Sequence, residues 1–373
     1  MKNKKYSVTS FDNVHQKISK KKQKWKIKNI AINIYRWFLL TIIIQIIALY
    51  YFDSVYFVKK SEITLTSYTD GENKKSLKNG TSVSIPIESK FTKVSFDANY
   101  VAYILNGGLE FTNVKNKKNI KKIKHQENII SYCRWLHDRN IIVYAEKIMQ
   151  GGKQTGLQIY TYDVEAEVEK KYPKITSSIA TMYEVTDIEA SPFTNVVYVK
   201  VCLNEKISGI YRFNIMDEIR HVMDTENDTI VEETNFADNL VYQDSDKRIF
   251  VRDGTGRAAK ELKFQDKVEL LRVDLDDKVY VGLLNNTGEV EKICCGKITD
   301  KTEQWSTIGL GKPVRTQDVY ISLNGGIYTN MRDESTLYNL KDGQKTKIDG
   351  EFIDIINDYI IIRNKDKVIF KTI

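Results

Sequence analysis

The sequence predicts an all-β protein, a β-propeller of seven blades, preceded by one N-terminal transmembrane α-helix. After residue 60, short runs rich in Val, Ile, Tyr and Phe alternate with Gly/Asn/Asp turns, and this pattern recurs to the end of the chain. Such alternation is typical of strands joined by hairpins. An uncharged apolar run lies near the N-terminus. Six or eight blades, a β-sandwich pair and a β-solenoid are the alternatives.

The clearest hairpin covers residues 100–114, where two apolar runs flank Asn106-Gly107-Gly108. Asn-Gly between alternating runs is the strongest short-range hairpin signal. A repeating unit of four strands and roughly 37–56 residues is typical of a propeller, whose blades bury their faces against each other. The predicted units are 94–124, 130–172, 185–223, 235–264, 268–299, 314–348 and 352–372.

The predicted ring needs one more strand, because the last unit supplies three at most. The strand-like run Thr81–Ile87 precedes the first unit and has no partner of its own. We therefore expect this run to pair with residues 352–373, since an open ring leaves sheet edges and apolar faces in water. The predicted organisation is a basic cytoplasmic tail (1–36), a transmembrane helix (37–58), a stalk with the ring-closing strand (59–90) and the propeller (91–373).

The transmembrane prediction depends on residues 37–52, which carry no charge. A helix from Arg36 to Val58 would be about 34 Å long, enough for a hydrocarbon core of about 30 Å. Trp37 lies at one end, and Tyr50 and Tyr51 lie near the other, as expected for interfacial aromatic belts. A cleaved signal peptide and a buried core helix are the alternatives. A cleaved signal peptide is disfavoured because no small-x-small cleavage site follows the apolar run.

The formal net charge of +8 is concentrated in the tail. Residues 1–36 hold eleven basic residues and one acid, whereas the remaining residues hold 46 basic and 48 acidic ones. A nearly neutral domain has no field to attract nucleic acid. The positive-inside rule predicts a single-pass protein of the cell membrane, with a cytoplasmic N-terminus and an extracytoplasmic C-terminal domain. The Lys17–Lys28 cluster is expected to contact anionic lipid, or else to be a solvated arm.

No linear motif predicts a catalytic, cofactor-binding or metal site, and no cofactor is expected. His-x-x-x-His, Gly-x-Ser-x-Gly and the phosphate-binding glycine motifs are absent from the sequence. His125 and His137 fall in or beside predicted turns and are expected to be solvated. Asp253-Gly-Thr-Gly is interpreted as a blade hairpin. Carboxylate clusters occur at Asp244/Asp246, Asp274/Asp276/Asp277 and Asp187/Glu189. The cluster that begins at Asp274 lacks the glycine bend of a calcium loop and is interpreted as a strand and turn.

The cysteines and aromatic residues are expected to be structural. Buried free thiols are favoured for Cys133, Cys202, Cys294 and Cys295, with a Cys133–Cys202 disulfide as the alternative. Aromatic side chains at strand spacing are expected to form the core between blades: Tyr132, Trp135, Tyr160, Tyr162, Tyr198 and Tyr211.

Two segments carry a resemblance to known proteins. Phe96-Asp-Ala-Asn-Tyr-Val-Ala-Tyr-Ile-Leu-Asn-Gly-Gly and Ala190-Ser-Pro-Phe-Thr-Asn-Val-Val-Tyr-Val place a polar turn before an aliphatic and aromatic strand. This pattern resembles the repeat of TolB-like propellers and of the N-terminal propeller of dipeptidyl-peptidase IV-type proteins, over roughly residues 91–373. The first segment lacks the usual Pro and Gly. The resemblance implies architecture, because the Gly-x-Ser-x-Gly elbow of the peptidases is absent.

These observations favour a non-enzymatic, membrane-anchored propeller that acts as a protein-interaction or sensing module at the cell envelope, with an envelope protein as its partner. The longest inserts, Met149–Gly156 and Lys174–Glu184, are the expected contact loops. The alternative is a polysaccharide- or peptidoglycan-binding receptor or enzyme whose site is assembled from several blades. A deep funnel lined by convergent charged side chains favours that alternative, and a plugged channel favours the first hypothesis.

Overall fold

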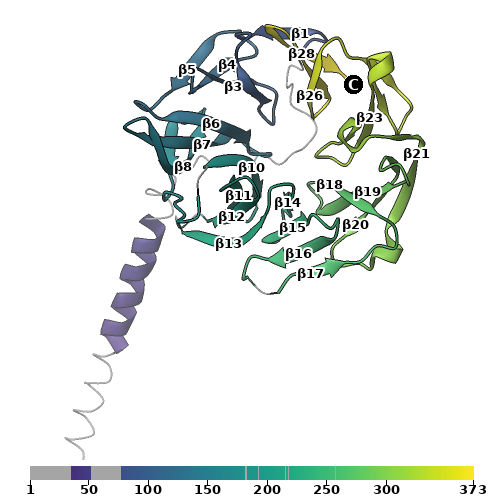
Figure 1. Cartoon of the computed structure of the whole chain (residues 1–373). Helices are drawn as coiled ribbons and strands as arrows, with labels where there is room; N and C mark the ends of the chain where they lie inside the picture. Colours follow the sequence, from purple (N-terminus) through teal and green to yellow (C-terminus); the bar gives the residue numbers. More distant parts are fainter. Residues whose placement is uncertain are drawn as a thin grey trace, which may run out of the picture. The chain divides into compact units, whose positions relative to one another are not determined.

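The computed structural model describes residues 35–51, 77–180, 183–191, 193–214, 216, 218–256 and 258–373. The chain divides into two units, residues 1–75 and 76–373. The second unit contains seven four-stranded antiparallel sheets arranged in a ring (Figure 1). The predicted all-β, seven-bladed propeller is therefore confirmed.

Each blade consists of four strands, here called A to D from the centre of the ring outward, as β10 to β13 illustrate in Figure 1. The strands of blades 1 to 4 are β2 (Lys90–Val94), β3 (Tyr100–Leu105), β4 (Gly108–Asn113), β5 (Asn119–Ile123); β6 (Ile129–Trp135), β7 (Ile141–Gln150), β8 (Lys153–Asp163), β9 (Val168–Lys171); β10 (Glu184–Ser191), β11 (Val196–Cys202), β12 (Ile207–Phe213), β13 (Ile219–Glu226); and β14 (Ile230–Glu233), β15 (Asn239–Gln243), β16 (Ile249–Asp253), β17 (Lys260–Leu262).

Blades 5 to 7 follow the same order, except that the last D strand comes from the N-terminal side of the propeller. Their strands are β18 (Val268–Val273), β19 (Lys278–Leu284), β20 (Val290–Lys297), β21 (Ser306–Val314); β22 (Val319–Ile321), β23 (Ile327–Met331), β24 (Thr336–Asn339), β25 (Lys345–Lys347); and β26 (Glu351–Ile356), β27 (Tyr359–Asn364), β28 (Lys367–Thr372), β1 (Thr81–Ser84). Because successive strands are antiparallel, the AB and CD turns lie at one end of the ring and the BC and DA connections at the other.

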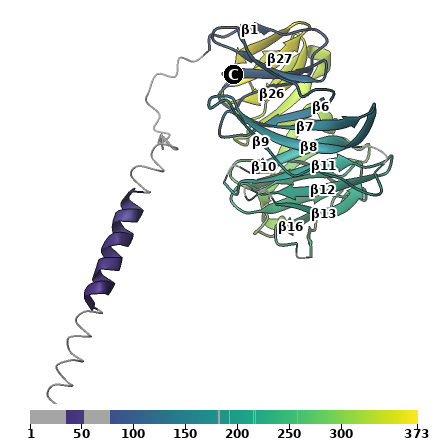
Figure 2. The ribbon, with the colours of Figure 1, turned by 90° about the vertical axis from the view of Figure 1, so that its left-hand side faces the viewer.

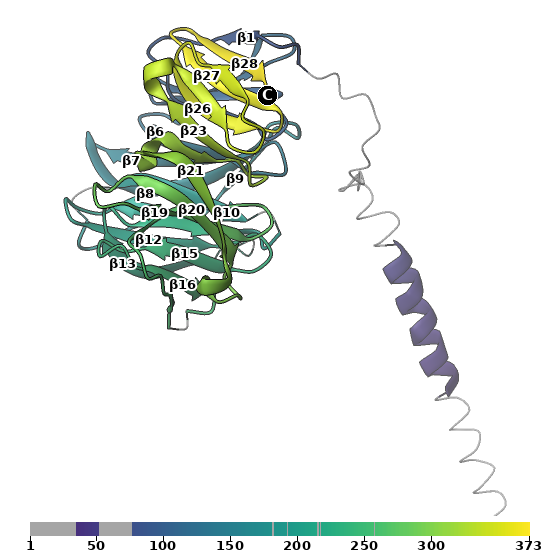
Figure 3. The same ribbon diagram turned by 90° about the vertical axis from the view of Figure 1, so that its right-hand side faces the viewer.

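The ring closes through β1, which pairs with β28 (Figures 1 and 3); Figure 2 shows β1 beside the yellow strands of blade 7. Thr81 lies opposite Phe370, and Val83 lies opposite Val368. The side chains of Val83, Val368 and Phe370 are fully buried in a cluster shared by blades 7 and 1. This pairing confirms the predicted ring-closing strand.

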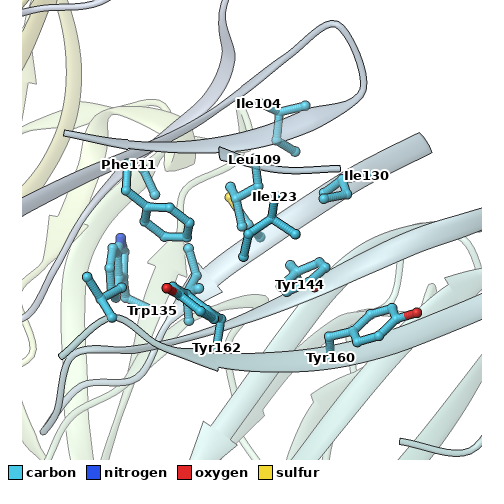
Figure 4. Packing of buried hydrophobic residues seen from close by; sticks show 13 residues of the cluster. Ile104, Leu109, Phe111, Ile123, Ile130, Trp135, Tyr144, Tyr160 and Tyr162 are labelled. Atoms are coloured by element: carbon cyan, nitrogen blue, oxygen red, sulfur yellow. The ribbon is translucent and has the colours of Figure 1, made fainter. Parts of the chain in front are cut away.

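Neighbouring blades are held together by apolar side chains. Between blades 1 and 2, Phe111 packs edge-on against Trp135, with ring centroids 6.0 Å apart, and tilts over Tyr162 at 5.4 Å (Figure 4). Burying aromatic rings in edge-to-face pairs stabilises a core beyond the area they remove from water. The predicted aromatic core is confirmed here for Trp135 and Tyr162.

The first unit contains a helix over residues 35–51. Among the described residues, no helix is long and apolar enough to cross a membrane. The predicted transmembrane helix is therefore not supported: residues 35–51 span only about 25 Å at the rise of an α-helix, less than a hydrocarbon core of about 30 Å. Residues 52–58 of the predicted span and the tail up to residue 34 lie outside the described part of the chain.

Two local expectations need revision. Met149–Gly156 is not a long loop, because β7 and β8 continue to a tight turn in which Gly151 and Gly152 both have positive φ. Such a turn matches the twist of a hairpin. In blade 5 the fourth strand is β21, which lies beyond the predicted unit 268–299. The four cysteines are buried and free, as favoured.

Candidate functional site

The A strands of blades 2 to 5 bring charged side chains together at the centre of the ring. They surround a cavity of about 10 Å³, which has room for a single water molecule. Asn235 and Leu323, from the AB turns of blades 4 and 6, also line it. The complete lining consists of Arg134, His137, Glu189, Ala190, Glu232, Glu233, Asn235, Arg272, Val273 and Leu323.

Arg134 joins blade 2 to blade 3. Its Nη1 and Nη2 atoms donate hydrogen bonds to the two carboxylate oxygens of Glu189 at 2.5 and 2.9 Å, and Nη1 lies 3.4 Å from Asp187 Oδ1. Tyr132 donates its hydroxyl to the same Asp187 oxygen at 3.3 Å. Burial raises the pKa of Glu189, whereas Arg134 acts in the opposite direction. The two-pronged geometry is the strongest form of an arginine–carboxylate pair.

The next two links join blade 4 to blade 5 and blade 5 to blade 6. Glu232 Oε2 accepts a hydrogen bond from the backbone N–H of Val273 at 3.1 Å. Arg272 Nη1 donates to the backbone carbonyl of Ile321 at 3.0 Å. Burial raises the pKa of Glu232, and Arg272 opposes this shift. Charged side chains therefore connect A strands that are adjacent in the ring but far apart in the sequence.

Glu233 differs from these paired groups. Its Oε2 atom is buried and has no hydrogen-bond partner among the described residues, while Oε1 lies 3.5 Å from the Thr194 hydroxyl. Burial raises the pKa of this carboxyl well above its usual value, and the negative charge of Glu189 adds to the effect. A buried carboxyl without a partner is more stable protonated than ionised.

His137 also contributes to the cavity lining. Burial lowers the pKa of its imidazole well below 6.5, and Arg134 and Arg272 add to the shift. The imidazole is therefore neutral at pH 7. His137 lies in the AB turn of blade 2, as expected, but it is half-buried and lines the cavity, so the expectation of a fully solvated side chain needs revision.

His125 is likewise not a solvated turn residue. Its Nδ1 lies 2.9 Å from Glu146 Oε1 and its Nε2 lies 3.3 Å from Glu169 Oε2, and its ring packs on Tyr160. The imidazole thus joins the connection between blades 1 and 2 to three strands of blade 2. Because both ring nitrogens have partners, neither is available to a substrate.

The carboxylate clusters have separate structural roles. Asp187 and Glu189 both pair with Arg134 at the central cavity. Asp274 Oδ1 instead accepts the N–H groups of Asp276 and Lys278 within a turn. Asp244 and Asp246 both pair with Arg248. In the part of the chain that the structure describes, no group of His, Cys, Asp and Glu is arranged to hold a metal ion.

The sequence predicted no site residues, yet one signal for the channel exists. Each repeat from blade 2 to blade 5 has a charged residue in its A strand shortly before the AB turn, where a buried strand would otherwise be apolar. The repeat-related residues are Arg134, Glu189, Glu232 and Arg272. Aligning the repeats by their AB turns would have grouped them.

What this site can do is limited by its size. Most of its charged groups have hydrogen-bond partners in a neighbouring blade, either a side chain or the backbone, and a cavity for one water molecule cannot admit a sugar or a peptide. The arrangement joins blade 2 to blade 3 and blades 4, 5 and 6 to one another, and it includes a carboxyl that can gain or lose a proton.

The comparisons with known proteins concern the fold. No protein-family model matches the chain, and no curated protein matches it. Its structure is similar to TolB from Acinetobacter baumannii (TM-score 0.44, 13% identity, 66% of this chain and 63% of that one). It is also similar to dipeptidyl peptidase 4 from Porphyromonas gingivalis (TM-score 0.46, 10% identity, 69% and 45%). The chain thus covers less than two thirds of either protein.

A third similar structure is the β-propeller domain of Cps50 (Swd1) from Myceliophteria thermophila. It has a TM-score of 0.53 at 10% identity, with 78% of this chain and 99% of that domain covered. The matched structures thus include a TolB and a dipeptidyl peptidase, the two kinds of protein whose repeat the sequence resembles. The similarity is one of propeller fold.

Proposed function

We propose that this chain is a non-enzymatic protein-interaction or sensing module. The observation that carries the proposal is the small size of the central cavity. Charged side chains converge there, but Arg134 pairs with Glu189, backbone groups hold Glu232 and Arg272, and the space left is that of one water molecule. Binding then takes place on the loops and edges of the ring. A rigid ring with variable loops is suited to protein recognition, because scaffold and contact residues are separate.

The proposal places the module at the cell envelope, held at a membrane by its N-terminal segment. Two observations support this location: the uncharged run 37–52, whose apolar side chains within the helix are exposed, and the eleven basic residues before it. Basic segments next to a membrane are attracted to anionic lipid.

Fractionation of cells tests the location. The full chain should sediment with membranes and resist extraction at high salt and at alkaline pH, and a reporter fused after Ile373 should be active outside the cytoplasm. Release by salt alone would indicate peripheral binding, and a cytoplasmic reporter would refute the topology.

Cross-linking in the producing cells tests the interaction. The full chain should give specific protein adducts, and substitutions in Met149–Gly156 or Lys174–Glu184 should change their pattern if these segments make the contact. Adducts absent from every variant and from the native chain would overturn the interaction proposal.

A glycan-binding receptor or enzyme is the second and less well supported candidate, because Arg134, Glu189, Glu232 and Arg272 converge from different blades but leave room for only one water molecule. Purified peptidoglycan sacculi provide the probe. Co-sedimentation with sacculi that is lost in Glu233→Gln but retained in the exposed control Glu88→Gln would support this candidate. Equal behaviour of both variants would count against it.

A further inference from the structure

Two exposed phenylalanines lie side by side at the AB end of the ring. Phe193 in the AB turn of blade 3 and Phe236 in the AB turn of blade 4 stack with ring centroids 4.8 Å apart and an interplanar angle of 19°. Although each ring covers the other, the residues remain 61% and 60% exposed. Single exposed apolar residues are ordinary, whereas a stacked aromatic pair in water resembles the anchors of protein interfaces.

The turns that carry the pair are fixed to each other. Ser191 donates its hydroxyl to the backbone carbonyl of Asn235 at 2.7 Å, which joins the two turns directly. The Asp277 carboxylate of blade 5 accepts the backbone N–H groups of Asn235 and Phe236. The rings are thus presented on a preorganised surface, which lowers the entropy lost when a partner binds.

The surroundings of the pair are acidic. The AB turns of blades 3 to 5, residues 192–195, 234–238 and 274–277, contain Asp238, Asp274, Asp276 and Asp277 and no Lys or Arg. Arg212 of β12 pairs with Asp238, but Asp276 is exposed. Exposed carboxylates beside an apolar contact favour partners that place a cation there.

We propose that these AB turns bind a protein segment in which an aromatic or aliphatic side chain, seated on Phe193 and Phe236, stands next to a Lys or Arg. This inference rests on the proposed protein-interaction function and names its surface and partner chemistry. The acidic turns repel anionic lipid, so a protein segment fits the surface better than a membrane does. The exposed part of the ring pair supplies the apolar contact, and Asp276 supplies the charge.

Site-specific photo-cross-linking of the full chain tests the assignment. p-Benzoylphenylalanine replaces Phe236 in the producing cells, and a matched chain carries it at Val168, which is 59% exposed on β9 of blade 2. The chain with the probe at position 236 should give a protein adduct that the chain with the probe at position 168 does not give. The cross-linked peptide of the partner should contain an apolar residue adjacent to a Lys or Arg. That peptide, made synthetically, should bind the full chain.

Variants of the full chain then separate the contribution of the phenylalanine pair from that of Asp276. Phe193→Ser/Phe236→Ser should weaken peptide binding at least tenfold, Asp276→Lys should weaken it and reduce its salt dependence, and Val168→Ser should leave it unchanged. These residues are exposed, so circular dichroism and the Tm should match the native chain.

Protein adducts that arise only from other positions, such as Lys174–Glu184, would overturn this surface while leaving the proposed function intact. An adduct at 236 to lipid, to glycan, to another copy of this chain or to an acidic peptide would also overturn it. If no position on the ring gives a protein adduct, the proposed function fails as well.

Discussion

Val83 lies directly opposite Val368 in the antiparallel pair that closes the ring. Both side chains are completely or almost completely buried, in one cluster with residues of blade 1. The contact therefore joins the two ends of the propeller sequence and two blades at the same time.

Replacing Val83 by Asp should destabilise the propeller by several kcal/mol, because an ionised carboxylate would enter an apolar cluster. Ser84→Asp is the matched control, since Ser84 is the exposed neighbour on the same strand. Urea denaturation of the two full-length variants compares their free energies of unfolding. Similar values would show that β1 is not part of the cooperative fold.

The Arg134–Glu189 pair should behave as a buried ion pair. Arg134→Ala should cost about 3–5 kcal/mol, because Glu189 then remains buried without its main partner. Arg134→Met combined with Glu189→Leu should recover most of this loss. A double-mutant cycle measured by urea denaturation gives the coupling free energy, and additive effects would contradict the pairing.

Glu233 should make stability fall as pH rises. Burial raises the pKa of this carboxyl, so the native state keeps a proton that the unfolded chain releases above about pH 4.5. The free energy of unfolding should therefore fall as the pH rises from about 4.5 to the raised pKa of the folded state. Glu233→Gln should reduce this slope and stabilise the protein at pH 7 by about 1–2 kcal/mol. His137 acts oppositely, since its lowered pKa costs stability as pH falls from 6.5.

Unfolding free energies measured across that pH range check the prediction, with Glu88→Gln as the exposed control. A slope that Glu233→Gln leaves unchanged would contradict it.

The cysteine thiols should be unreactive in the folded protein. Burial raises the pKa of Cys133 to about 12, so almost no thiolate is present at neutral pH. Ellman's reagent should detect all four thiols rapidly in urea but react slowly without it. Rapid reaction of the native chain would show that the core around Cys133 opens readily.

The strands of the fold could be predicted because their signals are local. The Asn106-Gly107 turn and the alternating runs around it define a hairpin without reference to the rest of the chain. β21 was missed because Gly309, Gly311 and Pro313 interrupt its apolar pattern, and such residues usually indicate turns. Its pairing with β20 keeps it extended.

The charged lining of the central cavity could not be predicted in the same way. Arg134 and Glu189 meet only after two blades have folded and packed, and neither residue has a distinctive neighbour in the sequence. His137 follows a strand as a turn residue should, and it lines the cavity because residues of several blades meet there.

Closure by β1 also determines the order of events during synthesis. The strand is among the first parts of the propeller to leave the ribosome, yet its partner β28 is the last strand of the last blade. Pairing segments so distant in the chain gives a high contact order and slow folding. Until the last blade is made, β1 and the exposed face of blade 1 offer unpaired edges to other chains. We therefore expect the nascent chain to depend on a chaperone until the last blade has been made.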